Sequence, residues 1–145
     1  FQNKGTAAAE NIVVQDLIDE TKFDISSLQL TGSSHPQTTK ITDNKVEFLF
    51  QNINLPSEEE NEPASHGYIA FKIKTRNDLV LGDVIENKAN IYFDYNYPIE
   101  TNTTSATVAP LLNINSMLIS IVIRLRLVKK PNTPMKNNAA LINNK

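Results

Sequence analysis

The chain contains no cysteine, and only two histidines occur among its 145 residues. Without cysteine, disulfides, zinc–thiolate sites and thiol nucleophiles are excluded. A long hydrophobic run is also missing. The longest apolar stretch, residues 117–128, includes two arginines and is shorter than the roughly 18 apolar residues of a spanning helix, so we expect no membrane span. The formal net charge is only −2, so strong electrostatic binding to nucleic acid is not expected either.

The charged residues are distributed unevenly along the chain. Residues 1–100 contain all 16 acidic residues and 8 basic ones, a net charge of −8, whereas residues 101–145 contain 6 basic residues and no acidic ones. This change predicts one domain over residues 1–108 and a separate segment over residues 109–145. Residue 1 is phenylalanine rather than methionine, so we expect the chain to be a fragment, and the lack of a signal peptide carries no information about secretion.

Short segments with period-two hydrophobicity dominate residues 1–108 and predict β-strands. Residues 45–50 and 69–73 alternate in this way, and Asp43 and Asn44 suit a hairpin turn before the first of them. Residues 84–93 are predicted to form one long strand. Residues 11–18 are β-branched at their centre and predict a strand, with a helix over residues 7–21 as the alternative. The pattern favours an all-β, antiparallel sandwich whose core contains Val46, Phe48, Phe50, Ile69, Phe71 and Ile73.

The last 37 residues differ from the rest of the chain in composition and residue pattern. Residues 119–128 alternate as a strand would, with Arg124 and Arg126 on one face. After Pro131 the chain is rich in asparagine, lysine and proline, and we expect disorder there. We therefore interpret residues 109–145 as a tail, a linker or a truncated or out-of-frame segment that does not dock on the sandwich. Pairing of residues 119–128 with an open sheet edge is the alternative.

Residues 3–16 follow the pattern N-x-G-x-x-x-A-x-N-V-x-V-x-D, with isoleucine at the first valine position. This stretch resembles the opening of the conserved repeat domain of bacterial surface proteins. With residues 30–36, 61–73 and 82–104, the chain more closely resembles a C-terminal variant of that domain in large secreted proteins of the Bacteroidota. The resemblance covers about residues 1–108. It implies an immunoglobulin-like β-sandwich, extracellular or on the cell surface, whose first strand is clipped here.

In the family that the chain resembles, a linker and a sorting domain for type IX secretion usually follow. Only 37 residues follow Val108, and no start of the Tyr-Pro-Asn-Pro kind is present among them. Export by that route is therefore an implication of the resemblance alone.

The two histidines, His35 and His66, each follow a serine in a turn-like segment. We expect each ring to brace its loop through hydrogen bonds to the backbone. A metal site would need a further ligand, such as one from residues 58–62. Ser65 and His66 with an acid make a catalytic triad on paper only, because chain neighbours rarely face each other in that geometry and no nucleophile elbow is present.

Two groups of acids are candidates for calcium, which prefers carboxylate oxygens. One lies in residues 57–63, interpreted as a charged loop, and the other lies near residues 94–100. Neither has the alternating spacing of a calcium loop, so a solvated loop tip is the competing interpretation, and we predict no metal and no cofactor. The candidate ligands are Glu58, Glu60, Glu62, Asp94 and Glu100.

Tyr92, Tyr95 and Tyr97 crowd one region beside Phe93. Such a cluster could stack on sugars, but alternation would send Phe93, Tyr95 and Tyr97 to one face, and filling of the core is the competing interpretation. An intramolecular isopeptide bond between Lys72 and Asn90, assisted by Glu86, is conceivable, although no spacing selects these residues.

The sequence thus predicts a non-catalytic module that presents neighbouring domains of the same polypeptide. The alternative is an adhesion module that binds a surface glycan or a protein through residues 92–97 or the end loops. Neither a nucleic-acid partner nor an enzymatic activity is predicted. By the resemblance, the module is extracellular or on the cell surface.

Overall fold

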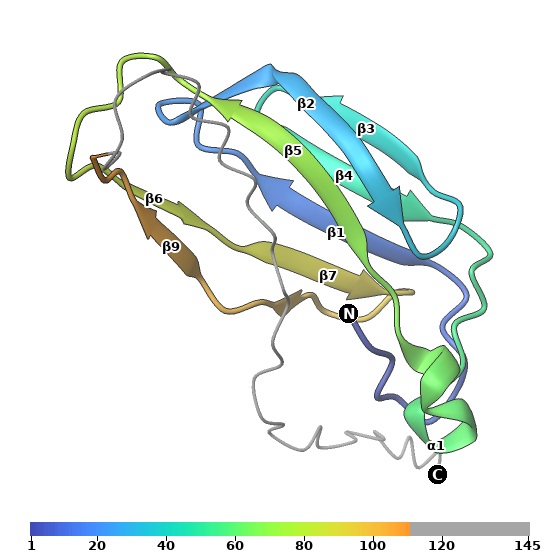
Figure 1. The fold of residues 1–145 in the computed structure, drawn as a ribbon. Coiled ribbons are helices and arrows are strands. Elements are labelled where there is room, and N and C mark those ends of the chain that lie inside the picture. Colours follow the sequence, from blue (N-terminus) through green and yellow to red (C-terminus); the bar gives the residue numbers. More distant parts are fainter. Residues whose placement is uncertain (111–145) are drawn as a thin grey trace, which may run out of the picture.

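The structure, a computed structural model, describes residues 1–110 (Figure 1). These residues form nine strands, one short α-helix and one turn of 3-10 helix. The strands are β1 (Ile12–Leu17), β2 (Phe23–Ser33), β3 (Thr38–Thr42), β4 (Lys45–Phe50), β5 (Ile69–Thr75), β6 (Val84–Asn87), β7 (Ala89–Phe93), β8 (Ile99–Glu100) and β9 (Thr104–Thr107). The helices are α1 (Glu58–Asn61) and the 3-10 turn η1 (Pro63–Ser65).

Five strands form the main sheet, in the order β3-β4-β1-β7-β8, with every neighbouring pair antiparallel. Strands β2 and β5 form a second antiparallel pair that lies over the main sheet, and β6 and β9 form a third pair beside it (Figure 1). Apolar side chains from both layers fill the space between them. The structure therefore confirms the predicted all-β, antiparallel sandwich.

The predicted core faces are confirmed, but two of the six residues are less buried than the others. Val46, Phe48 and Phe50 alternate along β4 and are fully buried, and Ile73 on β5 is buried as well. Ile69 and Phe71 point to the same core but remain partly exposed. The reason is that β5 belongs to a layer of only two strands, which covers the main sheet incompletely.

Strand β1 settles the choice between strand and helix at residues 11–18. Its buried positions are Ile12, Val14 and Asp16, two residues apart, followed by Ile18 just beyond the strand. The hairpin between β3 and β4 is also confirmed. Asp43 at its tip has a φ of 52°, a left-handed conformation that aspartate tolerates better than most residues.

Two predicted elements were wrong in detail. The single strand over residues 84–93 is two strands, because the chain leaves its pairing with β9 at Asn87 and pairs with β1 from Ala89. The charged loop over residues 57–63 contains α1, which Ser57 caps by accepting a hydrogen bond from the Glu60 amide (3.2 Å).

The predictions for the tail concern residues that the structure does not describe, apart from residues 109 and 110. These are the strand over residues 119–128, the disorder after Pro131 and the edge pairing. Within residues 1–110, no helix is long and apolar enough to cross a membrane.

Candidate functional site

Asn3 is a buried polar hub near the start of the chain. Its side-chain amide nitrogen donates to the carbonyls of Ala7 and Leu55, both at 2.9 Å, and its side-chain oxygen accepts from the Gly5 amide at 3.0 Å. Its backbone carbonyl accepts from the amide of Glu58 (2.9 Å). A single asparagine therefore ties the segment before β1 to the segment that leads into α1.

Asn11 and Asp94 form a second link, between the start of β1 and the end of β7. The Asn11 amide donates to the Asp94 carboxylate (2.7 Å), and the Asp94 amide donates back to the Asn11 carbonyl (2.8 Å). The side-chain oxygen of Asn11 accepts from the Asn52 amide (3.1 Å). Asp94, a candidate calcium ligand, thus uses one carboxylate oxygen to hold the backbone.

Asp16 is the one carboxylate within the described core, and Asn87 is its partner. The Asn87 amide nitrogen donates to Asp16 Oδ2 at 2.7 Å, while Asp16 Oδ1 is buried without a hydrogen-bond partner. Burial raises the pKa of Asp16 to about 6, against the opposing effect of the hydrogen bond from Asn87. The alternation along β1 places this acid inward, but local sequence gave no indication of its partner on β6.

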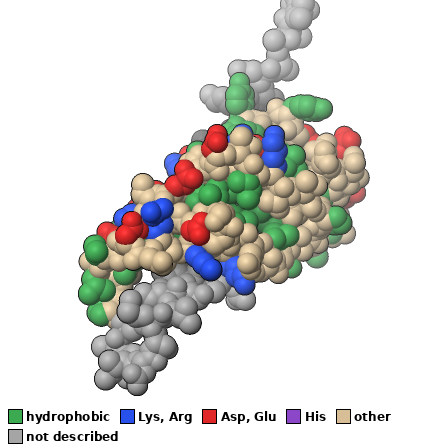
Figure 2. Space-filling model, turned by 90° about the horizontal axis from the view of Figure 1, so that it is seen from above, with side chains coloured by type: hydrophobic (Ala, Val, Ile, Leu, Met, Phe, Trp, Pro, Cys, Tyr) green, Lys and Arg blue, Asp and Glu red, His purple; other side chains and the backbone are tan. Residues whose placement is uncertain are grey.

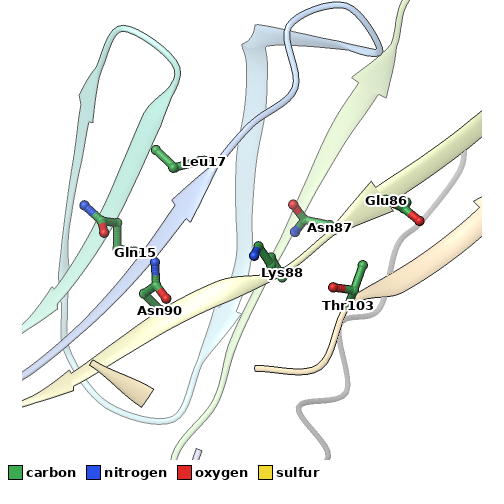
Figure 3. A pocket seen from close by; sticks show the side chains of 7 residues that line it. All are labelled: Gln15, Leu17, Glu86, Asn87, Lys88, Asn90 and Thr103. Atoms are coloured by element: carbon green, nitrogen blue, oxygen red, sulfur yellow. The ribbon is translucent and has the colours of Figure 1, made fainter. Parts of the chain in front are cut away.

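A pocket of about 320 Å³ opens where β6 passes into β7 (Figure 3). We call it the crossover pocket. Its lining combines three amides, one acid, one base, one hydroxyl and one apolar side chain. They come from β1, β6, β7, the single residue between β6 and β7, and the segment before β9. The lining residues are Gln15, Leu17, Glu86, Asn87, Lys88, Asn90 and Thr103.

Gln15 and Asn90 lie directly opposite each other in the β1–β7 register, so their side chains share one face of the main sheet. The Tyr92 hydroxyl, two residues further along β7, donates to Gln15 Oε1 at 3.1 Å. Tyr92, predicted as part of an aromatic binding cluster, therefore holds a pocket residue in place. Sequence reasoning missed Gln15 and Asn87 as site residues, because only the pairing of distant strands brings them together.

Tyr95 and Tyr97 lie away from this pocket, in the connection between β7 and β8. Their side chains are 104% and 95% exposed, so the expectation that they fill the core was wrong. Asp94, with a φ of 50°, turns the chain and ends the alternation of β7. Asn96 then fixes the turn, because its amide and its side-chain nitrogen both donate to the Phe93 carbonyl.

The other candidate calcium ligands do not converge on one point. Glu58 pairs with Lys4 at 2.9 Å, Glu62 with His66 at 2.9 Å and Glu100 with Lys88 at 3.2 Å. Glu60 lies exposed on α1. Among residues 1–110, no group of three or more histidine, aspartate or glutamate side chains is placed to hold a metal ion.

The histidines hydrogen-bond to side chains rather than to the predicted backbone partners. His35 Nδ1 lies 2.9 Å from the hydroxyl of Ser34, and His66 Nε2 lies 2.9 Å from a carboxylate oxygen of Glu62. Ser65 is fully buried, and its hydroxyl donates to the Glu62 carbonyl (2.8 Å). Ser65 and His66 thus bond to different groups of Glu62, the serine to its backbone carbonyl and the histidine to its carboxylate.

The three residues considered for an isopeptide bond belong to three different strand pairings. Lys72 lies on β5, which pairs with β2, Glu86 lies on β6, which pairs with β9, and Asn90 lies on β7 in the main sheet. An isopeptide bond between strands needs the lysine and the asparagine to be neighbours, and this sheet order does not make them so.

Charge on the surface is mixed in sign. On the face seen in Figure 2, acidic and basic side chains are interspersed around a hydrophobic area, and neither sign dominates. Most of the ion pairs are exposed or half-exposed, and pairs of this kind contribute little to stability.

Residues 1–107 match the family described as "Domain of unknown function (DUF7619)". The chain belongs to this family. Neither a curated protein nor a solved structure matches the chain. The match to DUF7619 ends at Thr107, the last residue of β9, so it covers all nine described strands.

Proposed function

We propose that residues 1–108 form a non-catalytic spacer module of a bacterial secreted or cell-surface protein, which presents neighbouring domains of the same polypeptide. One observation carries the proposal. The two asparagines of the N-x-G-x-x-x-A-x-N opening form hydrogen bonds within the fold. The side chain of Asn3 bonds three backbone groups. Asn11 links the start of β1 to the ends of β4 and β7. A motif that served a ligand would leave such groups turned outward.

The two ends of the module are both fixed by backbone hydrogen bonds. The Gly67 amide donates to the Phe1 carbonyl at 2.9 Å. At the other end, the Gly82 amide donates to the Val108 carbonyl (3.0 Å) and the Val108 amide donates to the Asp83 carbonyl (2.9 Å). Chain segments held in this way suit a module that sets a defined distance between its neighbours.

The resemblance to the C-terminal repeat class of the Bacteroidota supports the finer part of the proposal. It favours an extracellular or cell-surface location and delivery by type IX secretion. Brief protease treatment of intact cells that produce the protein tests the location. Digestion of the module before any cytoplasmic marker is the expected result, and complete protection in intact cells with digestion after lysis would contradict it.

A distance measurement tests the spacer role. The full chain is placed between two folded reporter proteins that carry spin labels, and a glycine–serine linker of equal length replaces it in the control. We expect a narrow distance distribution for the chain and a broad one for the linker, which behaves as a random coil. Equal widths would show that the module does not hold its neighbours apart.

Binding of a surface glycan or a protein is the second candidate function, and one observation favours it. Tyr95 and Tyr97 are almost fully exposed on a turn that Asn96 fixes, and exposed aromatic residues on a rigid turn are suited to stacking on a sugar or docking on a partner. A glycan array with the full chain and with a Tyr95→Ala/Tyr97→Ala variant tests this candidate. Tyr68→Ala is the matched control, because Tyr68 is also exposed (57%) but lies outside this turn.

A further inference from the structure

The acid behind the crossover pocket has no evident role in packing. Asp16 occupies a core position of β1 between Val14 and Ile18, where an apolar side chain would fill the space without the cost of burying a carboxylate. One of its oxygens accepts a hydrogen bond from Asn87, a residue of the pocket lining, and its second oxygen has no partner. Asp16 therefore holds the side chain of Asn87 at the point where β6 passes into β7.

Asp16 and the side chain of Asn87 lie on the core face of the main sheet, because Asp16 is buried and alternates with Gln15 along β1. Asn87 therefore fixes the crossover beside the pocket rather than offering its side-chain amide to a ligand. Gln15 lies on the outer face of the sheet, where the pocket opens. Tyr92 donates to the carbonyl oxygen of Gln15, so the Gln15 amide nitrogen remains as a donor. Asn90, opposite Gln15 in the register, adds one further donor and one further acceptor (Figure 3).

The charges and the size of the pocket narrow the class of ligand. Glu86 and Lys88 bring one charge of each sign, but the Lys88 ammonium is paired with Glu100 at 3.2 Å, so the site does not favour an anion. Leu17, 56% exposed, adds an apolar wall. A volume of about 320 Å³ is at the lower limit for small-molecule sites.

We propose that the crossover pocket binds a neutral polyhydroxylated ligand, namely a glycosyl unit of a carbohydrate. Fixed amide groups recognise hydroxyls because each amide offers a donor and an acceptor side by side, and the C–H face of a sugar ring packs on an aliphatic wall such as Leu17. This site is separate from Tyr95 and Tyr97, and it does not depend on the spacer role.

Nuclear magnetic resonance titration of the full chain tests the proposal. The probes are cellobiose and chitobiose as neutral sugars and glucuronate as the charged comparison. We expect the neutral disaccharides to shift the side-chain amide signals of Gln15 and Asn90, with a Kd on the order of 1 mM. Glucuronate should bind more weakly. Absence of shifts at these two amides with both neutral probes would overturn the proposal.

Two sets of variants separate the pocket from general effects on folding. Asn90→Ala should weaken binding at least about tenfold, equivalent to about 1.4 kcal/mol, and Asn77→Ala, at an exposed asparagine in the β5–β6 connection, should leave it unchanged. Asp16→Leu should weaken binding while the protein stays folded, whereas Asp16→Asn, which keeps an acceptor for Asn87, should retain most of it.

The location of the shifts distinguishes this proposal from the second candidate function. Shifts confined to Tyr95 and Tyr97 would place the sugar on the exposed turn and overturn the crossover pocket as the site. Equal affinity of the Asn90→Ala variant and the unmodified chain would also overturn it. Shifts at the pocket would support the proposal whether or not the spacer measurement succeeds.

Discussion

The ring of Phe48 stacks on the ring of Phe71, with their centroids 5.5 Å apart and their planes 29° from parallel. Phe48 belongs to β4 in the main sheet, and Phe71 belongs to β5 in the layer above it. This pair is therefore a direct contact between the two layers of the sandwich, and its loss should weaken their attachment to each other.

Truncation of each ring tests this contact. Phe48 is fully buried, so Phe48→Ala should lower the free energy of unfolding by about 3–5 kcal/mol. Phe71 is only partly buried, so Phe71→Ala should cost less, about 2 kcal/mol. Urea unfolding followed by circular dichroism measures both. Ile41→Ala on the exposed edge strand β3 is the control and should change stability by less than about 0.5 kcal/mol. A larger loss from Phe71→Ala than from Phe48→Ala would contradict the observed burial.

The stability of the protein should fall as the pH rises from about 4 to about 7. Asp16 has an ordinary pKa of 3.8, which burial raises to about 6 in the folded protein. The folded state therefore favours the protonated carboxyl. The stabilising contribution is complete below pH 3.8 and is lost as the pH rises through about 6. A difference of about two pKa units corresponds to about 3 kcal/mol.

Urea unfolding at a series of pH values measures this effect, and Asp16→Asn is the matched variant because its side chain does not titrate. The variant should lose the pH dependence between 4 and 7, to within about 0.5 kcal/mol. Hydrogen bonds from Thr21 lower the pKa of Asp19. This shift makes the stability rise with pH, but only at pH values below the range from about 4 to about 7. An unmodified chain that is most stable at pH 7 would show that Asp16 is ionised in the folded protein at no cost.

Gly67→Ala should loosen the first residues of the chain. A Cβ atom at Gly67 would lie 2.2 Å from the ring of Phe1, which packs edge-on against Phe50 with centroids 5.4 Å apart. The ring has to move away, and overpacking of this kind costs about 1–3 kcal/mol. Unfolding and the nuclear Overhauser effect between Phe1 and Phe50 report the change.

Gly32→Ala is the control for this substitution. A Cβ atom at Gly32 would meet nothing closer than 3.7 Å, an ordinary contact with the ring of Tyr68. Stability should therefore stay within about 0.5 kcal/mol. Retention of the Phe1–Phe50 signal at full strength in Gly67→Ala would mean that the ring is not held where the structure places it.

Local sequence was sufficient for elements whose environment repeats along the strand. Val46, Phe48 and Phe50 alternate because β4 has one buried face along its whole length, so period-two spacing identified both the strand and its core side. The same alternation placed Asp16 inward. Helix α1 also has a local signal, because Ser57 with Glu60 three residues later has the spacing of a capping box. The dense negative charge of residues 57–63, taken alone, favours a loop instead.

Non-local pairing decided what the sequence did not reveal. Residues 84–93 have one continuous strand pattern, and only the change of partner from β9 to β1 divides them at Lys88. The crossover pocket follows from this division, since it brings Asn87 and Asn90 together with Gln15 of β1. The exposure of Tyr95 similarly depends on the left-handed conformation of Asp94, which alternation does not anticipate.

The hydrogen bonds at the two ends of the module have a mechanical consequence. Phe1 is bonded to Gly67, just before β5, and Val108 is bonded to Gly82, in the connection that follows β5. Besides the covalent chain, a tensile load applied at Phe1 and Val108 would therefore reach the domain on either side of the same strand. Strand β5, whose seven residues span about 20 Å, lies between these two points and is hydrogen-bonded to β2. The β2–β5 pairing should therefore contribute to the force at which the domain unfolds.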